Sequence, residues 1–253
     1  MHRLPKKCLF FAQISYIRLY FDLILRYGDV MKKTFLSPFF TPVAFSVCWS
    51  AVLAVVLIFF PEQKFLITED GEIIELFTNI GYILMLATML FLSKDYTDKI
   101  TSWGIYLFLG ICAFLREAGI QHHLSRTDST PFKSRFFLNP DNPWGEKIVF
   151  GLLLLVVFGA ILYLGIKYAK HLVTSFFKLN TVTWSTAVLC TTLVFAKFAD
   201  RFPGNWRHNH DGELLPREQI EIWSLLEESS EMFLPYLVVI IMVQYHLLKS
   251  KQQ

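Results

Sequence analysis

The last long apolar run of the chain begins with three glutamates, Glu227, Glu228 and Glu231, and from Met232 to Leu248 it contains no Asp, Glu, Lys or Arg. Counting about 20 residues back from Lys249 places Glu228 and Glu231 at or just inside the boundary of a bilayer core. Residues three and four apart share one side of a helix, so all three carboxylates lie close together. Ionised carboxylates at that depth are usually paired, protonated or directed into a wet cavity. The stretch therefore predicts a charged site at the membrane boundary.

Three other apolar segments bring polar side chains to the same expected level. The segment 73–93 begins beside Glu72 and Glu75, with Asn79 one turn further on; the segment 102–120 ends in Arg116, Glu117, Gln121, His122 and His123; the segment 179–198 ends in Lys197, Asp200 and Arg201. A helical bundle that joins these ends would enclose a polar cavity open to the outer face.

Two interpretations of these charges remain open, a structural ion-pair network and a functional site. Helix dipoles favour acids in the first turn and cations in the last turn, so Arg116 or Lys197 can pair with Glu75 or Glu231 as a clamp between helices. Glu117 and Asp200 do not fit that explanation, because each is an acid near a helix C-terminus. Each needs a partner, a proton or a metal. We therefore take Glu75, Glu117, Glu231 and Arg116 as the candidate catalytic residues.

A metal site is a further hypothesis at this level. Neutral imidazole together with carboxylates suits zinc, iron or manganese, and the candidate ligands are His122, His123, Glu227 and Glu228. Adjacent residues diverge by about 100° on a regular helix, so both histidines can face one ion only where the helix frays. None of these pairs has a spacing that is diagnostic of a particular metal.

The composition requires a membrane around this site. Of the 253 residues, 54% are hydrophobic and 16% aromatic, which indicates an all-α polytopic membrane protein rather than a soluble domain. Residues 1–30 carry Arg18, Asp22 and Arg26 within an apolar stretch, so we expect an N-terminal extension that is interfacial or precedes the true start at Met31. Residues 31–253 are expected to form one six-helix transmembrane domain. The expected spans are 43–60, 73–93, 102–120, 147–166, 179–198 and 225–248.

The lysines orient these spans. They concentrate in the loops 94–101 and 167–178 and in the tail after Leu248, whereas the opposite loops hold most of the acids. The positive-inside rule then places both termini in the cytoplasm, in a bacterial-type inner membrane. The basic residues are short membrane flanks, so nucleic-acid binding has no support and membrane lipid is the expected partner. The chain also lacks a phosphate-binding loop, a dinucleotide-binding glycine turn, a G-x-S-x-G elbow and an H-E-x-x-H motif.

Three stretches in order resemble a group of uncharacterised bacterial multi-pass inner-membrane proteins: residues 69–78, EDGEIIELFT; residues 114–117, FLRE; and residues 227–231, EESSE. The resemblance covers about 69–248 and implies no particular activity. A fainter similarity is to the ceramidase and adiponectin-receptor-like membrane hydrolases, which hold zinc among their helices. This chain has six expected spans rather than seven and lacks their His-x-x-x-His in the last span.

These observations leave three classes of function. The first is an enzyme that acts on a lipid or lipid-linked substrate at the outer face, by metal-assisted hydrolysis or transfer. The second is a non-catalytic partner or assembly protein. The third, ranked lowest, is a proton- or cation-coupled carrier, because the inner halves of the spans offer few polar residues.

The lysine distribution gives a testable topology. Reporter fusions after Lys99 and after Lys251 are expected to report the cytoplasm, and a fusion after Asn205 is expected to report the outside. Alkaline phosphatase and green fluorescent protein fusions would measure this. The reverse pattern at any of the three points would contradict an outer location for the charged site.

Overall fold

A computed structural model describes residues 30–59, 73–93, 102–119 and 134–250, and the elements of this part are all helical. They are α2 (Phe40–Phe59), α4 (Ile73–Phe91), α5 (Gly104–Glu117), α7 (Ser134–Leu138), α8 (Trp144–Phe177), α9 (Thr181–Asn209) and α10 (Arg217–Lys249). Five of them, α2, α4, α8, α9 and α10, are long and apolar enough to cross a membrane. The prediction of an all-α chain with several membrane-type helices is confirmed.

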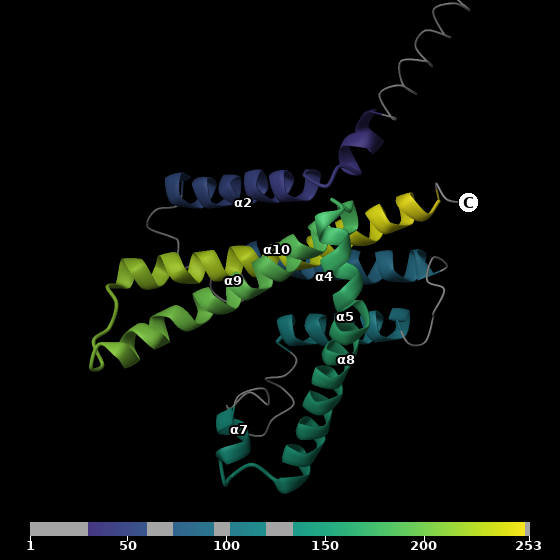
Figure 1. Cartoon of the computed structure of the whole chain (residues 1–253). Helices are drawn as coiled ribbons and strands as arrows, with labels where there is room; N and C mark the ends of the chain where they lie inside the picture. The colour runs from purple at the N-terminus through teal and green to yellow at the C-terminus, as the bar shows by residue number, and fades with distance from the viewer. Residues whose placement is uncertain (1–29, 60–72, 94–101, 120–133, 251–253) are drawn as a thin grey trace, which may run out of the picture.

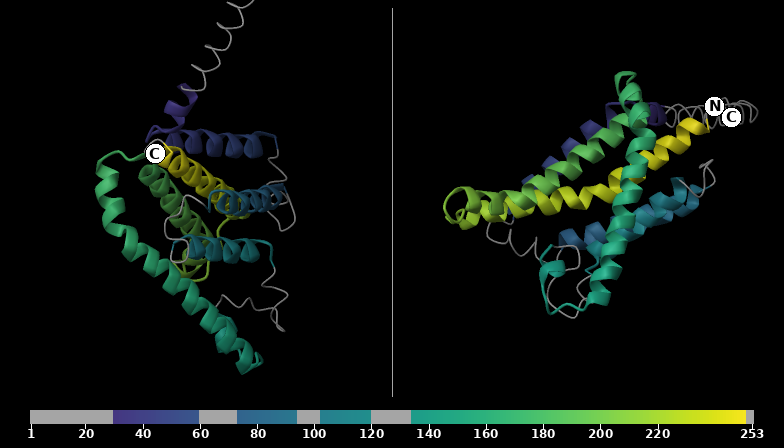
Figure 2. Two further views of the ribbon diagram at one scale, coloured as in Figure 1. Left: turned by 90° about the vertical axis from the view of Figure 1, so that its right-hand side faces the viewer. Right: turned by 60° about the horizontal axis from the view of Figure 1, so that its bottom comes forward.

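Helix α10 lies at the centre of the bundle. It packs most extensively against α9 and α4 and also contacts α2. Figures 1 and 2 show these helices side by side, with α5 next to α4. One apolar cluster joins Val56 of α2, Ile74 of α4, and Leu225 and Met232 of α10. The last helix therefore connects elements from most of the described chain.

Small side chains allow these helices to approach closely. The buried face of α9 consists of Thr181, Thr183, Ser185, Thr192, Ala196 and Ala199. On α4, a Cβ atom added to Gly81 would lie 2.7 Å from the Pro235 ring and 2.8 Å from the Tyr236 ring of α10. Small residues at such crossings are typical of helix packing in membranes, where van der Waals contact drives association.

A buried network of polar side chains joins α2 to α9 and α10 at the predicted inner end. Gln244 is fully buried; its Nε2–H donates to Thr41 Oγ1 at 3.2 Å and to the Phe35 carbonyl at 3.0 Å, while its Oε1 accepts from Ser185 at 2.6 Å. Thr41 and Ser185 are themselves 2.7 Å apart. Both the Nε2 and the Oε1 atoms of Gln244 thus have hydrogen-bond partners inside the bundle, as burial requires. The sequence-based expectation of almost no polar residues in the inner halves was wrong on this point.

Three of the expected element boundaries also need correction. The third expected span, 102–120, contains the 14-residue helix α5, about 21 Å long and shorter than a bilayer core. Helix α8 continues through Lys167 and Lys170 of the expected loop 167–178 and ends at Phe177, and α9 continues through Pro203 to Asn209, where a loop was expected. The expected N-terminal extension lies outside the described residues except for Val30.

Helix α8 stands apart from the rest. It crosses the bundle steeply in Figure 1, makes few contacts with α9 and α5, and has no buried residue in its most apolar stretch. Its contact with α5 includes Ser102, which accepts a hydrogen bond from Lys167 at 2.9 Å and lies 2.8 Å from the Tyr168 hydroxyl. Most of the α8 surface is therefore left for lipid.

The contact at Gly81 predicts a strong effect of substitution. Gly81→Val places methyl groups against Pro235 and Tyr236, and overpacking of this kind destabilises by roughly 1–3 kcal/mol. Gly159→Val is the matched control, because nothing lies within 4 Å of a Cβ at that helical glycine. Thermal unfolding of the detergent-purified variants measures both changes. Equal melting temperatures would contradict the close α4–α10 contact.

Candidate functional site

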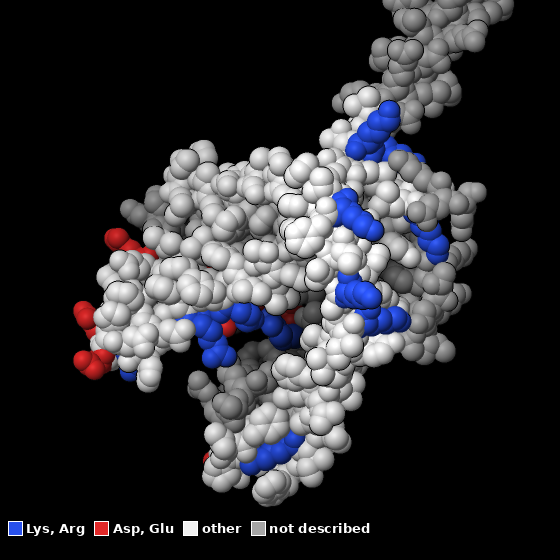
Figure 3. Space-filling model, viewed as in Figure 1, with Lys and Arg blue, Asp and Glu red and all other residues white. Residues whose placement is uncertain are grey.

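The carboxylate of Glu231 forms ion pairs with two cations, one from each of two other helices. Arg116 of α5 donates from Nη2 to Oε2 at 3.0 Å, and Lys197 Nζ of α9 lies 3.2 Å from Oε1. The Glu231 side chain is only 11% exposed, whereas those of Arg116 and Lys197 are 43% and 45% exposed. Figure 3 shows basic side chains at a hollow beside α9, with acidic atoms behind them. The charges expected at one level therefore do meet.

The end of α5 and the interior of α9 position the two cations. Helix α5 stops at Glu117, where Ala118 N–H donates to Phe114 O and Gly119 adopts a φ of 64°. A positive φ directly after a helix favours glycine and terminates the helix. Arg116 therefore occupies the last turn. On α9, Lys197 also donates to Asp200 Oδ2 at 3.4 Å, three residues further on.

Glu117 differs from Glu231 in its pairing. Its side chain is 13% exposed, and its described ion pair is a longer contact of 3.8 Å with Arg116 Nη2, the same nitrogen that donates to Glu231. The carboxylates of Glu231 and Glu75 lie near enough for their charges to act on Glu117. This carboxyl group is thus largely buried among other acids and shares its cation, an arrangement that suits a group that exchanges a proton.

Helix α4 provides a further wall. Glu75, Asn79 and Tyr82 follow a four-then-three spacing, which places them along one side of the helix. Tyr82 is buried and lines the cavity beside Glu231. The Oδ1 atom of Asn79 is buried without a hydrogen-bond partner among the described residues. A buried carbonyl oxygen in this state calls for a donor from water or a ligand.

The cavity between these helices has a volume of about 170 Å³. It combines charged and apolar walls, and the residues that line it are Tyr82, Ala113, Arg116, Leu193, Ala196, Lys197, Glu231 and Leu234. A liquid water molecule takes about 30 Å³, so the space holds several waters or a small polar group. The exposed parts of Arg116 and Lys197 leave donors that can reach such a group.

The remaining predicted site residues are the candidate metal ligands. Glu227 is half-buried on α10, near enough to Asp200 and Glu231 for their charges to interact. Glu228 is half-buried on the same helix. His122 and His123 lie outside the described residues. Within the described ranges, no group of three His, Cys, Asp or Glu side chains is placed to hold a metal ion, so the expected ligand set is not supported there.

Tyr82 is the cavity residue that sequence reasoning missed. A tyrosine inside an apolar run is typical of a packed core, and it does pack with Met85, Met89 and Met242. The available signal was its position seven residues after Glu75, on the same side of the helix.

Comparisons with known proteins identify no relative. The chain matches no protein-family model, no curated protein and no solved structure.

The shared carboxylate predicts a non-additive response to mutation. Arg116→Met or Lys197→Met alone leaves Glu231 with one cation, whereas the double variant leaves a nearly buried carboxylate with neither. We expect the double variant to lose roughly 3–5 kcal/mol, more than the sum of the single losses. Adding Glu231→Gln should recover much of that loss. Denaturant unfolding of purified protein measures the set; additive single effects with no rescue would contradict the shared pairing.

Proposed function

We propose that this chain is a membrane-embedded enzyme that acts on a lipid or lipid-linked substrate by acid–base catalysis at the outer side of the membrane. The observation that carries the proposal is the state of Glu117, a largely buried carboxyl group whose nearest described cation already donates to Glu231. A carboxyl group with a shared cation and acidic neighbours is suited to take up and release a proton.

The residues that line the cavity beside the Arg116–Glu117 pair have complementary roles in this proposal. Arg116 and Lys197 are fixed by Glu231 yet half-exposed, so their free N–H groups can hold an anionic group of the substrate. Glu117 then accepts a proton from water or from a substrate hydroxyl, and returns it to the leaving group in hydrolysis or transfer. Leu193 and Leu234 supply apolar wall for the lipid part.

The membrane setting is part of the proposal. We place the protein in a bacterial-type inner membrane with both termini in the cytoplasm, and with α5 as the core of a sixth, shorter span. The lysines of the predicted inner loops and the apolar outer surfaces of α2 and α8 support this placement.

A non-catalytic assembly protein is the second candidate. It is favoured by the complete pairing of Glu231, whose two oxygens join α5, α9 and α10 as a structural clamp would. The carrier is supported less. Polar side chains do occur in the inner half, but Thr186 Oγ1 donates to its own helix at Val182 O, and Gln244 bonds with Thr41 and Ser185. In the described part these bonds give no continuous path from the cavity.

The proposal is tested by Glu117→Gln. Because the contact with Arg116 is long, we expect the melting temperature to stay within a few degrees of the wild type while the activity is lost. The measurements are thermal unfolding and complementation of the growth or lipid phenotype of a deletion strain.

Glu221→Gln is the matched control. Glu221 is 16% exposed, close to the 13% of Glu117, but it pairs with Arg217 at 3.0 Å and lies ten residues before Glu231 on α10. It should retain activity. A Glu117→Gln variant that complements fully would refute the acid–base role, and one that unfolds would favour the assembly protein.

A further inference from the structure

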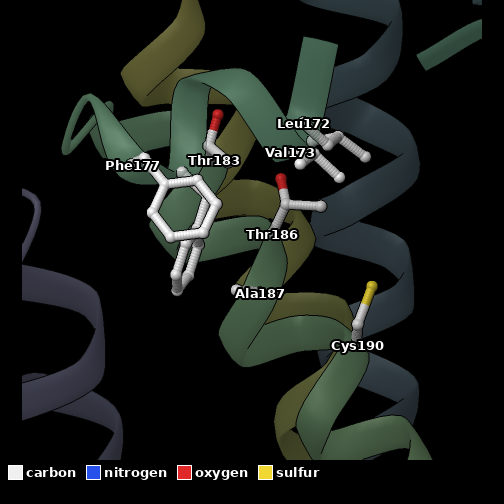
Figure 4. Close-up of a pocket in the computed structure, with 8 residues that line it drawn as sticks. Leu172, Val173, Phe177, Thr183, Thr186, Ala187 and Cys190 are labelled. Atoms are coloured by element: carbon white, nitrogen blue, oxygen red, sulfur yellow. The ribbon is translucent and has the colours of Figure 1, made fainter. Parts of the chain in front are cut away.

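A second cavity lies between α8 and α9. It has a volume of about 390 Å³ and is walled by the last turns of α8 and the first turns of α9. In Figure 4, Leu172 and Val173 lie to the right of Thr183 and Phe177 to its left, and Ala187 and Cys190 lie below. Cys190, the lining residue nearest to Lys197 in sequence, precedes it by seven residues, or about 10 Å along α9. This groove shares no lining residue with the cavity beside Glu231 and is therefore a separate site.

The turn between the helices holds the groove in shape. Leu179 adopts a φ of 54°, and the Asn180 side chain caps α9 by accepting from Thr183 N–H at 3.2 Å. The rings of Phe176 and Trp184 stack at 4.6 Å and 13°, and Trp184 Nε1–H donates to the Phe176 carbonyl at 3.2 Å. The two walls are thus braced against each other, and the groove does not require a ligand to form.

The groove offers an occupant apolar contacts only. The two hydroxyl groups in its wall already have partners: Thr186 Oγ1 donates to Val182 O at 2.8 Å, and Thr183 Oγ1 to Asn180 Oδ1 at 3.4 Å. The other lining side chains are apolar apart from the Cys190 thiol. The volume falls within the range of about 300–1,000 Å³ that is typical of small-molecule sites. An acyl chain fits this chemistry.

Positive charge surrounds the predicted inner end of the groove. Lys167, Lys170 and Lys178 lie in or next to the last turns of α8, and the sequence from Lys147 to Ala199 contains no Asp or Glu. Lys178 is exposed and directly follows Phe177; Lys170 is exposed and lies three residues before Val173, on the same side of α8. Figure 3 shows basic side chains over this end of α8. Basic groups at the inner surface attract anionic lipid head groups by about 1 kcal/mol each.

We propose that this groove binds one anionic phospholipid of the inner leaflet. One acyl chain lies between Val173, Phe177 and Ala187, and the phosphate lies within reach of Lys170 and Lys178. The lipid fills the space where α8 diverges from α9 and so fixes the position of the most weakly packed helix. This site is independent of the proposed catalytic function.

Native mass spectrometry of the full chain in detergent tests the proposal with phosphatidylglycerol and phosphatidylcholine as the probes. The wild type should retain one phosphatidylglycerol and bind phosphatidylcholine more weakly. Lys170→Gln with Lys178→Gln should lower phosphatidylglycerol affinity roughly 30-fold and leave phosphatidylcholine unchanged. Ala187→Phe, which fills the groove, should lower the affinity for both lipids.

Two controls match these variants. Lys249→Gln removes a lysine from the same expected side, on α10, and Ala51→Phe adds the same ring to an exposed position of α2. Both should bind lipid as the wild type does. The lysine pair is exposed, so its result stands even where Ala187→Phe fails to fold. Equal binding of both lipids, no retained lipid, or a lipid-free dimer whose formation Ala187→Phe abolishes would each overturn the proposal.

Discussion

A carboxylate placed in low-dielectric surroundings needs positive charge, and Glu231 obtains it from two helices at once. The contacts of 3.0 Å with Arg116 and 3.2 Å with Lys197 fix the end of α5 and the Lys197 turn of α9 relative to α10. Breaking a buried pair is far more unfavourable than forming it is favourable, so such contacts act chiefly as constraints on geometry. The same carboxylate holds the two half-exposed cations of the cavity at a defined spacing.

This arrangement explains why one acid differs from its neighbours. Seven acids, Glu72, Glu75, Glu117, Asp200, Glu227, Glu228 and Glu231, were expected at this level with three cations, Arg116, Lys197 and Arg201. Glu231 takes the shortest described contacts with both Arg116 and Lys197, and Glu117 is left with the longer one to Arg116. Competition for a limited number of cations, together with burial, leaves Glu117 with a longer and shared contact.

Much of this site could be predicted from the sequence, because the energetic penalty of burying charge is large and depends mainly on depth along a span. That reasoning placed Arg116, Lys197 and Glu231 together. It failed for Tyr82, because a tyrosine in an apolar run is as compatible with a packed core as with a cavity wall. It also failed for α9 beyond Lys197, because Pro203-Gly204 indicates a turn locally while packing against α10 keeps the chain helical. Lys167 and Lys170 also led to a wrong loop prediction, although both lie in α8. A long basic side chain can extend to the membrane surface while its backbone stays helical.

The inner network around Gln244 shows that buried neutral polar groups, like buried charges, need partners from other helices. Thr41, Ser185 and Gln244 satisfy one another inside the bundle, and each comes from a different helix. Neither hydropathy nor spacing indicates which polar residues of three separate spans will meet. Such pairings follow from the packing of the small face of α9 against α10, which the sequence does not specify alone.

The central position of α10 has a consequence for biosynthesis. Helices α2, α4, α5 and α9 are all translated before it, so Arg116 and Lys197 enter the membrane ahead of the carboxylate that binds them. During that interval the small face of α9 and the Gly81 surface of α4 also lack their partner. The bundle can therefore close only after insertion of α10. Maturation of the site is in this way coupled to near-completion of the polypeptide, and a chain arrested earlier displays unmatched charge and incomplete packing within the lipid.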